Sequence, residues 1–314
     1  MTMTRQKIWL DTDPGFDDWL TMLLLNSNPD IDWLGVSVVA GNAPVDITYD
    51  NALRIKANDA LDVPIYRGCD RPLNGVIETA QRILGDSGMP TTGAVLPPGA
   101  ATDAPGDAVD ALIAAVRAHP GQITLIAIAP MTNLATALQR APDIAGQIVE
   151  IIMMGGSSDQ GNHTAAAEFN VFADPEAADQ VFRAGIPMRM FGLNLCRQLL
   201  VTNAEVERLR AVGTPRAITL AGYLEAYVRI RSSDGSVPMP MYDPVVALYL
   251  EAPQLFQFLP AHVAIELKGE LTRGMTVCEF RVPRRAPVNT QVAHLADGPA
   301  AIELLMRRLT AIVA

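Results

Sequence analysis

Short apolar runs alternate with amphipathic stretches through residues 6–195 of the chain. The apolar runs predict buried strands at residues 6–12, 34–40, 123–129, 149–155 and 187–193. The amphipathic stretches predict helices at residues 45–60, 107–118, 131–140 and 175–184, and the apolar run from Trp19 to Leu25 predicts the start of another helix. This alternation is typical of an α/β fold, with an open, mostly parallel central sheet and flanking crossover helices.

The rest of the chain predicts insertions and a mixed tail. Residues 70–106 are rich in Gly, Pro and Thr and predict a long surface loop, whereas residues 197–242 are mostly helical in pattern. In that helical insertion Tyr223, Tyr227 and Arg231 have four-residue spacing, which predicts one shared helix face. Residues 262–314 predict two or three strands and a final helix. Because no repeat or linker is evident, we predict a single domain over residues 1–314 with these two insertions.

The unusual polar motifs of the chain fall where the predicted strands end. They are Asp11–Asp18, Gly41-Asn42, Pro130-Met131-Thr132-Asn133, Gly155-Gly156 and Asn194. In open α/β sheets, ligands bind outside the carboxyl ends of the strands. We therefore expect one binding site at this edge of the sheet.

Four aspartates, Asp11, Asp13, Asp17 and Asp18, occupy eight residues directly after the apolar run Ile8-Trp9-Leu10 of the first predicted strand. Carboxylates this close raise one another's pKa unless positive charge lies among them. An oxygen-rich acidic cluster suits Ca²⁺ or Mg²⁺, and Pro14-Gly15 supplies the turn that brings the acids together. Helix capping is the alternative explanation, but it accounts for one or two of the acids and not for all four.

Charge and cysteine content exclude several classes of function. The net charge of −10 and a pI near 4.9 argue against binding nucleic acid or an anionic membrane. Three widely spaced cysteines fit a reducing cytoplasm better than a disulfide framework or a zinc site. The start of the chain is too short and polar for a signal peptide, and no apolar stretch reaches membrane-spanning length. A cytoplasmic protein acting on a small molecule is the expectation.

Taken together, the motifs resemble the calcium-dependent nucleoside hydrolases, the nucleoside N-ribohydrolase family of inosine-uridine preferring type, over essentially the whole chain. The segments that carry the resemblance are Asp11-Thr12-Asp13-Pro14-Gly15-Phe16-Asp17-Asp18, Val39-Ala40-Gly41-Asn42, Pro130-Met131-Thr132-Asn133-Leu134-Ala135, Met153-Met154-Gly155-Gly156, Glu168-Phe169-Asn170 with Asp174-Pro175-Glu176-Ala177-Ala178, and Asp243-Pro244. The resemblance implies a Rossmann-like open sheet with Ca²⁺ at the carboxyl ends of its strands.

The resemblance also implies a role for each matching residue. The ligands of the ion would be the carboxylates of Asp13, Asp18 and Asp243 and the backbone carbonyl of Ile128. The residues that bind the ribose would be Asp17, Asn42, Met154, Asn162, Glu168 and Asn170, with Asn162 and Glu168 on the 5′-hydroxyl. Asp11 would orient its neighbours from outside the ligand set.

The implied reaction is hydrolysis of the N-glycosidic bond of a ribonucleoside to free base and ribose. A water held by Ca²⁺ would attack the anomeric carbon with Asp13 as general base, through an oxocarbenium-like transition state. Because the ion would hold the ribose diol, we expect ribonucleosides to be preferred over 2′-deoxyribonucleosides. The resemblance further implies a homodimer or homotetramer with a nucleoside substrate.

The base end of the site departs from the family pattern. Family members that act broadly on inosine and uridine have a histidine directly before the last aspartate ligand, where this chain has Tyr242, and many have a second histidine where it has Leu84. Purine-specific members stack the base on an aromatic residue at the first position, which Tyr242 matches by type. The alternative is that Tyr242 only packs against the following helix. Tyr227, Arg231 and Arg82 are further candidate base contacts, and no residue is assigned as the leaving-group acid.

Two other functions fit part of the pattern. A strand followed by Asp-x-Asp also opens the aspartyl-phosphate phosphatases, although Gly15 stands where that superfamily has a threonine. A nucleoside- or ribose-binding protein that keeps the metal site without turnover is the second alternative, because both histidines are missing. A dinucleotide-binding enzyme is disfavoured, since no Gly-x-Gly-x-x-Gly follows the first strand.

Overall fold

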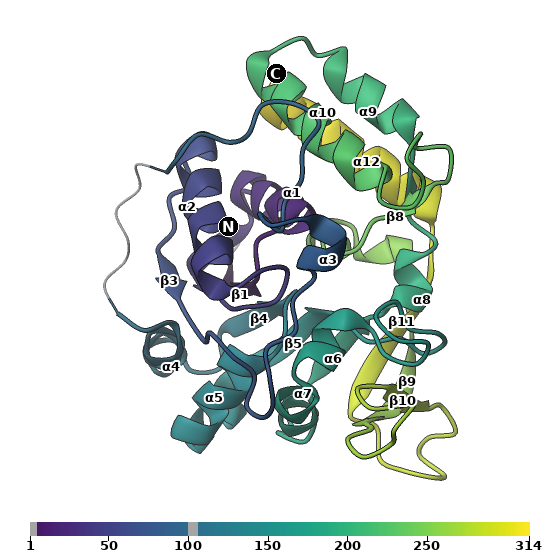
Figure 1. Ribbon diagram of the computed structural model, residues 1–314. Helices are drawn as coiled ribbons and strands as arrows, with labels where there is room; N and C mark the ends of the chain where they lie inside the picture. Colours follow the sequence, from purple (N-terminus) through teal and green to yellow (C-terminus); the bar gives the residue numbers. More distant parts are fainter. Residues whose placement is uncertain (1–4, 100–105) are drawn as a thin grey trace.

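A sheet of nine strands forms the centre of the protein in the computed structural model, which describes residues 5–99 and 106–314 (Figure 1). Its strands are β1 (Gln6–Thr12), β2 (Ile31–Val38), β3 (Ile65–Arg67), β4 (Ile123–Ala127), β5 (Ile148–Met154), β6 (Met188–Phe191), β9 (Phe256–Ile265), β10 (Thr276–Glu279) and β11 (Thr290–Ala296). β7 (Leu200–Val201) and β8 (Met239–Pro240) pair separately. The part of the long loop at 100–105 and the first four residues lie outside the described residues.

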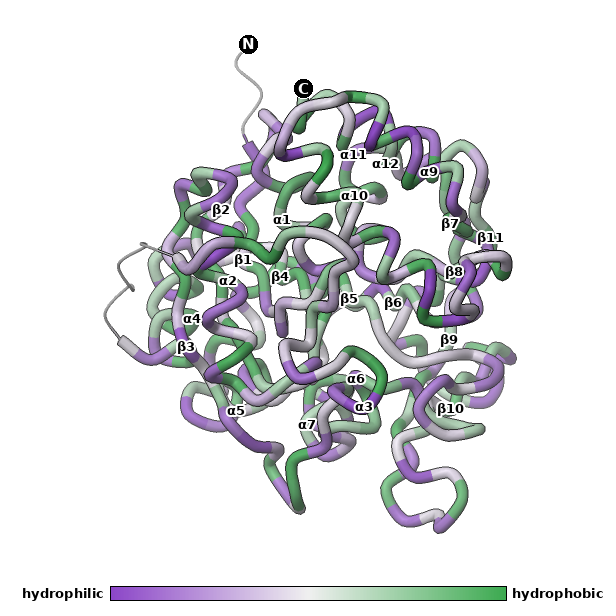
Figure 2. Tube along the Cα trace, turned by 45° about the horizontal axis from the view of Figure 1, so that its top comes forward, coloured by the Kyte–Doolittle hydropathy of each residue, from purple (hydrophilic) through white to green (hydrophobic). Residues whose placement is uncertain are grey.

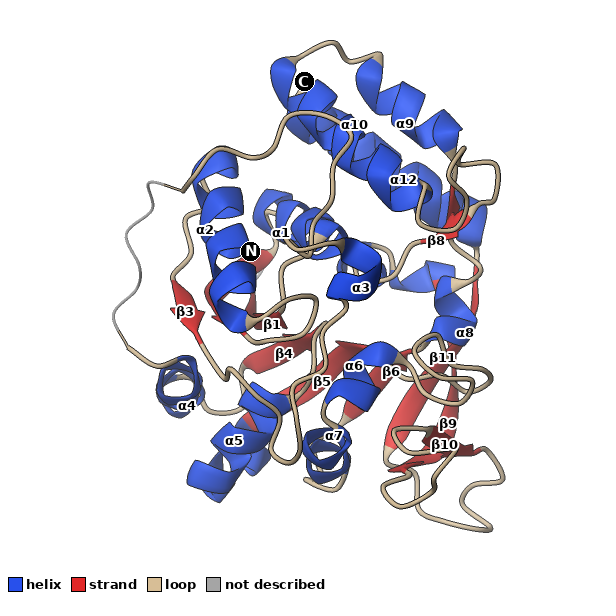
Figure 3. Ribbon diagram, viewed as in Figure 1, coloured by secondary structure: helices blue, strands red, loops and turns tan. Residues whose placement is uncertain are grey.

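Helices cover both faces of the sheet (Figure 3). They are α1 (Phe16–Ser27), α2 (Val45–Asp59), α3 (Gln81–Leu84), α4 (Ala108–Ala118), α5 (Thr132–Arg140), α6 (Phe169–Ala173), α7 (Pro175–Phe182), α8 (Leu193–Cys196), α9 (Asn203–Arg210), α10 (Pro215–Val228), α11 (Pro244–Glu251) and α12 (Gly298–Val313), with 3₁₀ turns at Pro142–Gln147 and Pro253–Leu255. No helix in the described parts of the chain is both long enough and apolar enough to cross a lipid bilayer.

The strand order β10-β9-β11-β6-β5-β4-β1-β2-β3 confirms the predicted α/β class. All neighbours from β11 to β3 are parallel, whereas β9 is antiparallel to both of its neighbours in this sheet, β10 and β11. Chain order reverses between β1 and β4, because β2 and β3 extend the sheet on one side while β5 and β6 extend it on the other. Ligands bind at such a reversal point, where crossover connections leave in opposite directions.

Two apolar cores, one on each face, bury the central strands on both sides. In β1, Ile8 and Leu10 join the core beneath α1, α10, α11 and α12, and Trp9 joins the core beneath α4, α5 and α7. Strands that are covered on both faces must be apolar throughout, which explains the continuous hydrophobic runs in the sequence. Figure 2 shows these strands as hydrophobic segments inside a more polar periphery.

Several predicted boundaries are wrong. The second strand covers 31–38 instead of 34–40, and the strand predicted at 187–193 ends at Phe191, so that Asn194 lies in α8. The first strand of the tail begins at Phe256, before the predicted position, and the short β3 was not predicted.

The predicted helix face of Tyr223, Tyr227 and Arg231 is also wrong for its last member. α10 ends at Val228, and Arg231 lies in the following turn with an exposed side chain. The guanidinium of Arg231 donates to the backbone oxygen of Pro238 at 3.0 Å. The turn therefore removes Arg231 from the helix face that its spacing suggested.

Candidate active site

The acidic cluster lies at the carboxyl end of β1, beside the reversal point of the sheet. Asp17 and Asp18 occupy the first turn of α1, and Asp243 lies at the start of α11. Each of these three residues offers a carboxylate oxygen, and the three oxygens lie within 4.8 Å of one another. α1 and α11 pack together, which brings residues more than 220 positions apart in the sequence into one cluster.

Asp18 is fixed by the loop that precedes it. Its carboxylate accepts hydrogen bonds from the hydroxyl of Thr12 at 2.5 Å and from the backbone N–H of Gly15 at 2.9 Å. The side-chain amide of Asn42 donates a third, at 3.2 Å. The Pro14-Gly15 turn therefore folds the chain back on itself, as the sequence predicted.

Asp13 is held from the other side by Gly41-Asn42. Its Oδ2 accepts a hydrogen bond from the backbone N–H of Asn42 at 2.6 Å, and a Cβ at position 41 would lie 2.0 Å from the same oxygen. Only glycine leaves room for this approach. Both side-chain hydrogen bonds of Asn42 go to Asp13 and Asp18, so the structure shows Asn42, expected to line the sugar, tying these aspartates together.

Asp243 occupies the N-cap position of α11 but does not cap the helix. Its backbone is helical and its side chain makes no capping hydrogen bond, whereas Pro244 follows at the first position of the helix. The residue is buried, with 5% of its surface exposed. Its carboxylate therefore lies in the acidic cluster and does not bond to the backbone N–H groups at the start of α11.

The carboxylates of the cluster carry like charges and are largely shielded from solvent. Burial and the charge of Asp18 raise the pKa of Asp13 well above its usual range, and burial with the charges of Asp17 and Asp18 does the same to Asp243. Burial and Asp18 raise the pKa of Asp17 to about 7. Buried carboxylates that raise one another's pKa need a positive partner, and oxygen ligands suit a hard divalent cation. These residues therefore fit the metal ion that the sequence predicts.

Ile128, Met154 and Asn170 lie together at the ends of β4 and β5. The side-chain Nδ2 of Asn170 donates to the backbone oxygens of Ile128 and Met154, both at 3.2 Å. In the described residues the Oδ1 of Asn170 has no hydrogen-bond partner. The predicted carbonyl ligand and two predicted ribose contacts are thus neighbours.

Glu168 and Asn162 lie on the loop between β5 and α6. Glu168 caps α6, and its carboxylate accepts from the backbone N–H groups of Gly156 and Asn170, both at 2.8 Å, and Val171, at 3.1 Å. Asn162 is exposed, and its Oδ1 accepts from the backbone N–H of Phe169 at 3.0 Å. The two residues predicted to bind the 5′-hydroxyl therefore lie on the same loop, where Asn162 bonds to the residue that follows Glu168.

Asp11 lies outside the cluster. Its Oδ1 accepts hydrogen bonds from the hydroxyl of Ser37 and from the side chain of Asn133, the latter at 2.8 Å, and burial raises its pKa to about 7. It joins β1 to β2 and α5, and its side chain contacts none of the predicted ligands by hydrogen bond.

Tyr227 reaches the acidic cluster from α10. Its hydroxyl donates to the backbone oxygen of Pro240 at 2.8 Å and lies 3.5 Å from Oδ2 of Asp17. The half-buried ring of Tyr242 packs edge-on to Tyr227, with centroids 6.5 Å apart. A small apolar cavity beside Asp17 is lined by Phe16, Leu84, Gly88, Pro90, Tyr227 and Ile230.

The other residues suggested for the base end lie elsewhere. Arg82 is exposed on α3 and does not line this cavity, and Arg231 is held in its turn by Pro238. Tyr223 is a core residue whose hydroxyl accepts from the backbone N–H of Leu96 at 2.9 Å. Of the candidate base contacts, the structure brings Tyr227 and Tyr242 to the cluster.

Asn51 was not predicted at the site, yet its side-chain amide donates to the backbone oxygens of Pro14 and Ser87, both at 2.9 Å. It ties the aspartate loop to the long 70–106 loop. A polar residue at a buried position of an amphipathic helix was the available signal, because such a side chain needs a hydrogen-bond partner.

Comparison with known proteins identifies relatives along nearly the whole chain. The family model described as inosine-uridine preferring nucleoside hydrolase matches residues 8–303. An inosine-uridine preferring nucleoside hydrolase of Leishmania major is 37% identical over 93% of both chains. The pyrimidine-specific ribonucleoside hydrolase RihA of Shewanella woodyi is 36% identical over 98% of both chains. The solved structure of a purine-preferring ribonucleoside hydrolase from Gardnerella vaginalis superposes with a TM-score of 0.88 at 29% identity, covering 98% of this chain and 99% of the other.

Proposed function

Because this chain belongs to the inosine-uridine preferring nucleoside hydrolase family and is a ribonucleoside hydrolase, we propose that its acidic cluster holds a calcium ion and that Asp13 is the general base. The observation that carries the proposal is the group formed by half-buried Asp17 with buried Asp18 and Asp243, next to Asp13, at the reversal point of the sheet. Asp13, Asp18, Asp243 and the carbonyl of Ile128 would hold the ion. When bound, such an ion supplies positive charge that orients sugar hydroxyls and makes a water more acidic.

The position of Asp13 suits a general base. Its Oδ2 is fixed by the backbone N–H of Asn42, whereas its Oδ1 has no hydrogen-bond partner within residues 5–99 and 106–314. A carboxylate held by one oxygen keeps the other oriented to accept a proton from the attacking water. The water adds to the anomeric carbon as the bond to the base breaks.

The remaining polar groups would bind the ribose and stabilise the charge that develops on it. We assign Asp17 and Asn170 to the 2′- and 3′-hydroxyls, since the Oδ1 of Asn170 has no partner among the described residues while its Nδ2 is fixed. We assign Asn162 and Glu168 to the 5′-hydroxyl. Carboxylate and amide oxygens around the sugar stabilise an oxocarbenium-like transition state because they carry negative charge or its partial equivalent.

A base-release assay tests this function. Inosine, adenosine, guanosine, uridine and cytidine are incubated with the enzyme, with calcium or with a chelator, and compared with their 2′-deoxy counterparts. We expect base release from at least one ribonucleoside, loss of release with chelator, and a rate at least about 100-fold lower for the 2′-deoxy substrate, because a site built to bind a hydroxyl rejects the analogue that lacks it. Comparable turnover of 2′-deoxynucleosides would contradict the assignment of Asp17 and Asn170.

Tyr242 is proposed to pack against the nucleobase. Replacement of Tyr242 by alanine is expected to lower kcat/KM by about 10-fold, because stacking on an aromatic ring would be lost, whereas phenylalanine should stay within about threefold of wild type. The two variants are compared on the best ribonucleoside of the panel. Equal losses in both would instead indicate that the hydroxyl of Tyr242 takes part in the reaction.

A further inference from the structure

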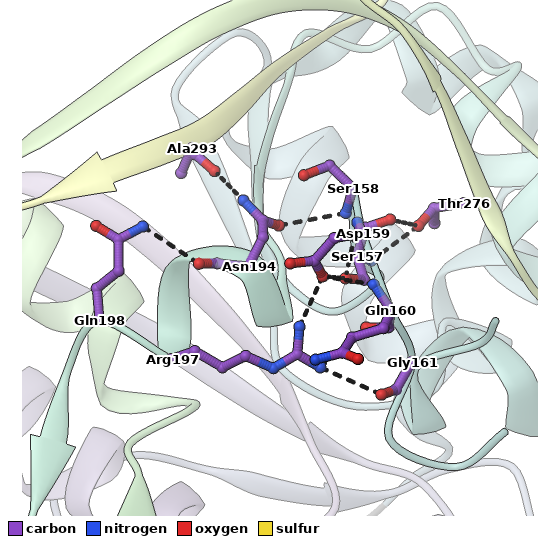
Figure 4. A network of polar contacts seen from close by, with 10 residues as sticks. All are labelled: Ser157, Ser158, Asp159, Gln160, Gly161, Asn194, Arg197, Gln198, Thr276 and Ala293. Atoms are coloured by element: carbon purple, nitrogen blue, oxygen red, sulfur yellow. Dashed lines mark hydrogen bonds and ion pairs between the residues drawn. The ribbon is translucent and has the colours of Figure 1, made fainter. Parts of the chain in front are cut away.

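The loop between β5 and α6, residues 155–168, is held by a polar network that the proposed mechanism does not use (Figure 4). The network centres on Asn194, in α8, and on Arg197, directly after that helix. Asn194 is one of the polar motifs at the strand ends, and Arg197 carried no signal in the sequence. Both act on the segment that precedes Asn162.

Arg197 binds three consecutive residues of the loop. Its Nη1 donates to Oδ1 of Asp159 at 2.6 Å, and its Nη2 donates to the backbone oxygens of Gln160, at 2.9 Å, and Gly161, at 3.2 Å. A planar guanidinium with several N–H donors can serve these acceptors at once, which a lysine ammonium on its flexible stem does less well. Arg197 thus fixes the backbone immediately before Asn162.

The rest of the network anchors the loop to the sheet. Asn194 accepts from the backbone N–H of Ser158 at 3.3 Å and donates to the backbone oxygen of Ala293 in β11 at 2.9 Å. Thr276 in β10 donates to the backbone oxygen of Ser157 at 2.6 Å and accepts from its N–H at 2.8 Å. The start of the loop is therefore held by two other strands of the sheet.

The held segment closes tightly on the residues around Glu168. A Cβ at Gly161 would lie 2.3 Å from the backbone oxygen of Ala167, so the two strands of the loop are in direct backbone contact. Next to it, the N–H of Asn162 donates to that oxygen at 3.2 Å. The Nδ2 of Asn162 has no hydrogen-bond partner in the described parts of the chain. By holding residues 159–161, Arg197 therefore helps to position the unpaired Nδ2 of Asn162 beside Glu168.

Resting on the proposed role of Asn162 and Glu168, we propose that Arg197 is a positioning residue for the 5′ end of the ribose. Its hydrogen bonds to residues 159–161 keep the loop in the shape that presents Asn162 next to Glu168. Without Arg197 the loop remains anchored at Ser157 and Ser158, but the segment that leads into Asn162 loses the three hydrogen bonds that Arg197 donates to it. Recognition of the 5′-hydroxyl then weakens, while the acidic cluster and the chemistry at the anomeric carbon stay intact.

A pair of substrates tests the proposal. The wild type and Arg197→Gln are assayed with the ribonucleoside cleaved fastest in the panel and with its 5′-deoxy analogue. The wild type should lose about 10- to 100-fold in kcat/KM on the 5′-deoxy analogue, the scale of a hydrogen bond that involves a charged group. Arg197→Gln should show a similar loss on the ribonucleoside, mainly through KM, and stay within about twofold of wild type on the 5′-deoxy analogue.

Two further variants separate positioning from general stability. Arg208→Gln breaks a comparable exposed ion pair with Glu303, far from the loop in sequence. This variant should leave kcat/KM unchanged on both substrates. If circular dichroism shows that Arg197→Gln does not fold, Asp159→Asn replaces it. This change removes the negative charge that pairs with Arg197, while the amide oxygen of asparagine can still accept from the hydroxyl of Ser157 and the N–H of Gln160, so we expect the same pattern with a smaller loss.

Equal losses on both substrates, or no loss on the ribonucleoside, would overturn the role of Arg197. A wild type that does not distinguish the two substrates would also overturn it, although base release itself would stand. Absence of base release from every ribonucleoside by the wild type would instead contradict the proposed function.

Discussion

Replacement of Asp243 by asparagine is expected to lower kcat/KM by about 10³-fold, the scale of removing one group that stabilises the developing charge in an active site. The same change should make the metal-free protein more stable, by at least about 1 kcal/mol, because asparagine carries no charge that must be either buried without a partner or neutralised by uptake of a proton. Burial and the charges of Asp17 and Asp18 raise the pKa of Asp243 well above its usual range, so the ionised form is disfavoured at this position. Activity and stability therefore change in opposite directions.

Asp243 suits this experiment because its carboxylate makes no capping hydrogen bond that the substitution would remove. Base release, calcium binding by calorimetry and thermal unfolding in chelator are measured on wild type and variant at pH 8. A metal-free variant that unfolds below the metal-free wild type would contradict the electrostatic explanation. A variant that keeps full activity would remove Asp243 from the ligand set.

Asp174 supplies the matched control. It is also a buried aspartate, but it accepts hydrogen bonds from the N–H of Leu73 at 2.8 Å, the hydroxyl of Thr132 at 2.7 Å and the N–H of Ala177 at 3.1 Å. Asp174→Asn should destabilise the protein by about 1–3 kcal/mol, since an acceptor of backbone N–H groups is lost, and should leave calcium affinity unchanged. Two buried aspartates would then show opposite changes in stability.

Removal of metal is expected to make the stability of the protein fall as pH rises from 5 to 8. Burial and neighbouring carboxylates raise the pKa of Asp17 to about 7 and that of Asp13 and Asp243 well above the usual range. The folded protein therefore keeps protons that the unfolded chain loses near its ordinary pKa of about 4. Where the folded state binds more protons than the unfolded state, the free energy of unfolding decreases with rising pH.

Calcium should reverse this loss, because the ion replaces the protons that the carboxylates would otherwise share. A free concentration 100-fold above Kd stabilises the folded state by about 2.7 kcal/mol, and the increase in Tm should be larger at pH 8 than at pH 5, where protons compete for the ligands. Thermal unfolding with and without calcium at the two pH values measures both effects. Metal-free stability that increases from pH 5 to pH 8 would exclude a cluster of mutually repelling carboxylates.

Around the acidic cluster, the sequence predicted which residues lie at the site better than it predicted their contacts. Asp13, Asp17 and Asp18 could be placed together because they are close in the chain and a Pro-Gly turn separates them. Asn42 was also placed at the site, but its atoms hold Asp13 and Asp18, and spacing along a sequence does not determine which neighbour an amide chooses. Arg231 was assigned to a helix face by periodicity, yet α10 ends before it, since a period of four residues does not mark where a helix stops.

For other residues the local sequence does not reveal the partner. Arg197 contacts residues 159–161 only because α8 follows β6 and β6 pairs with β5, so that two segments nearly 40 positions apart meet at the edge of the sheet. Asn51 reaches the aspartate loop because α2 lies against it. Contacts of this kind depend on packing between elements, and the sequence of either element alone is compatible with many partners.

By itself, the sequence determined the class of fold, the edge of the sheet that carries the site, and the family, because buried parallel strands need continuous apolar runs and the polar residues at their ends stand out against them. Only the tertiary structure decided that Asp17, expected as a ribose contact, offers a carboxylate oxygen beside those of Asp18 and Asp243, that the hydroxyl of Tyr227 lies near Asp17, and that Arg197 holds the loop of Asn162. The first two contacts depend on how α1 packs against α11 and α10, and the third depends on α8 following β6 beside β5. The physical reason is that periodicity and turn chemistry act within a few residues, whereas the distances between charges in a site are set by how distant segments pack.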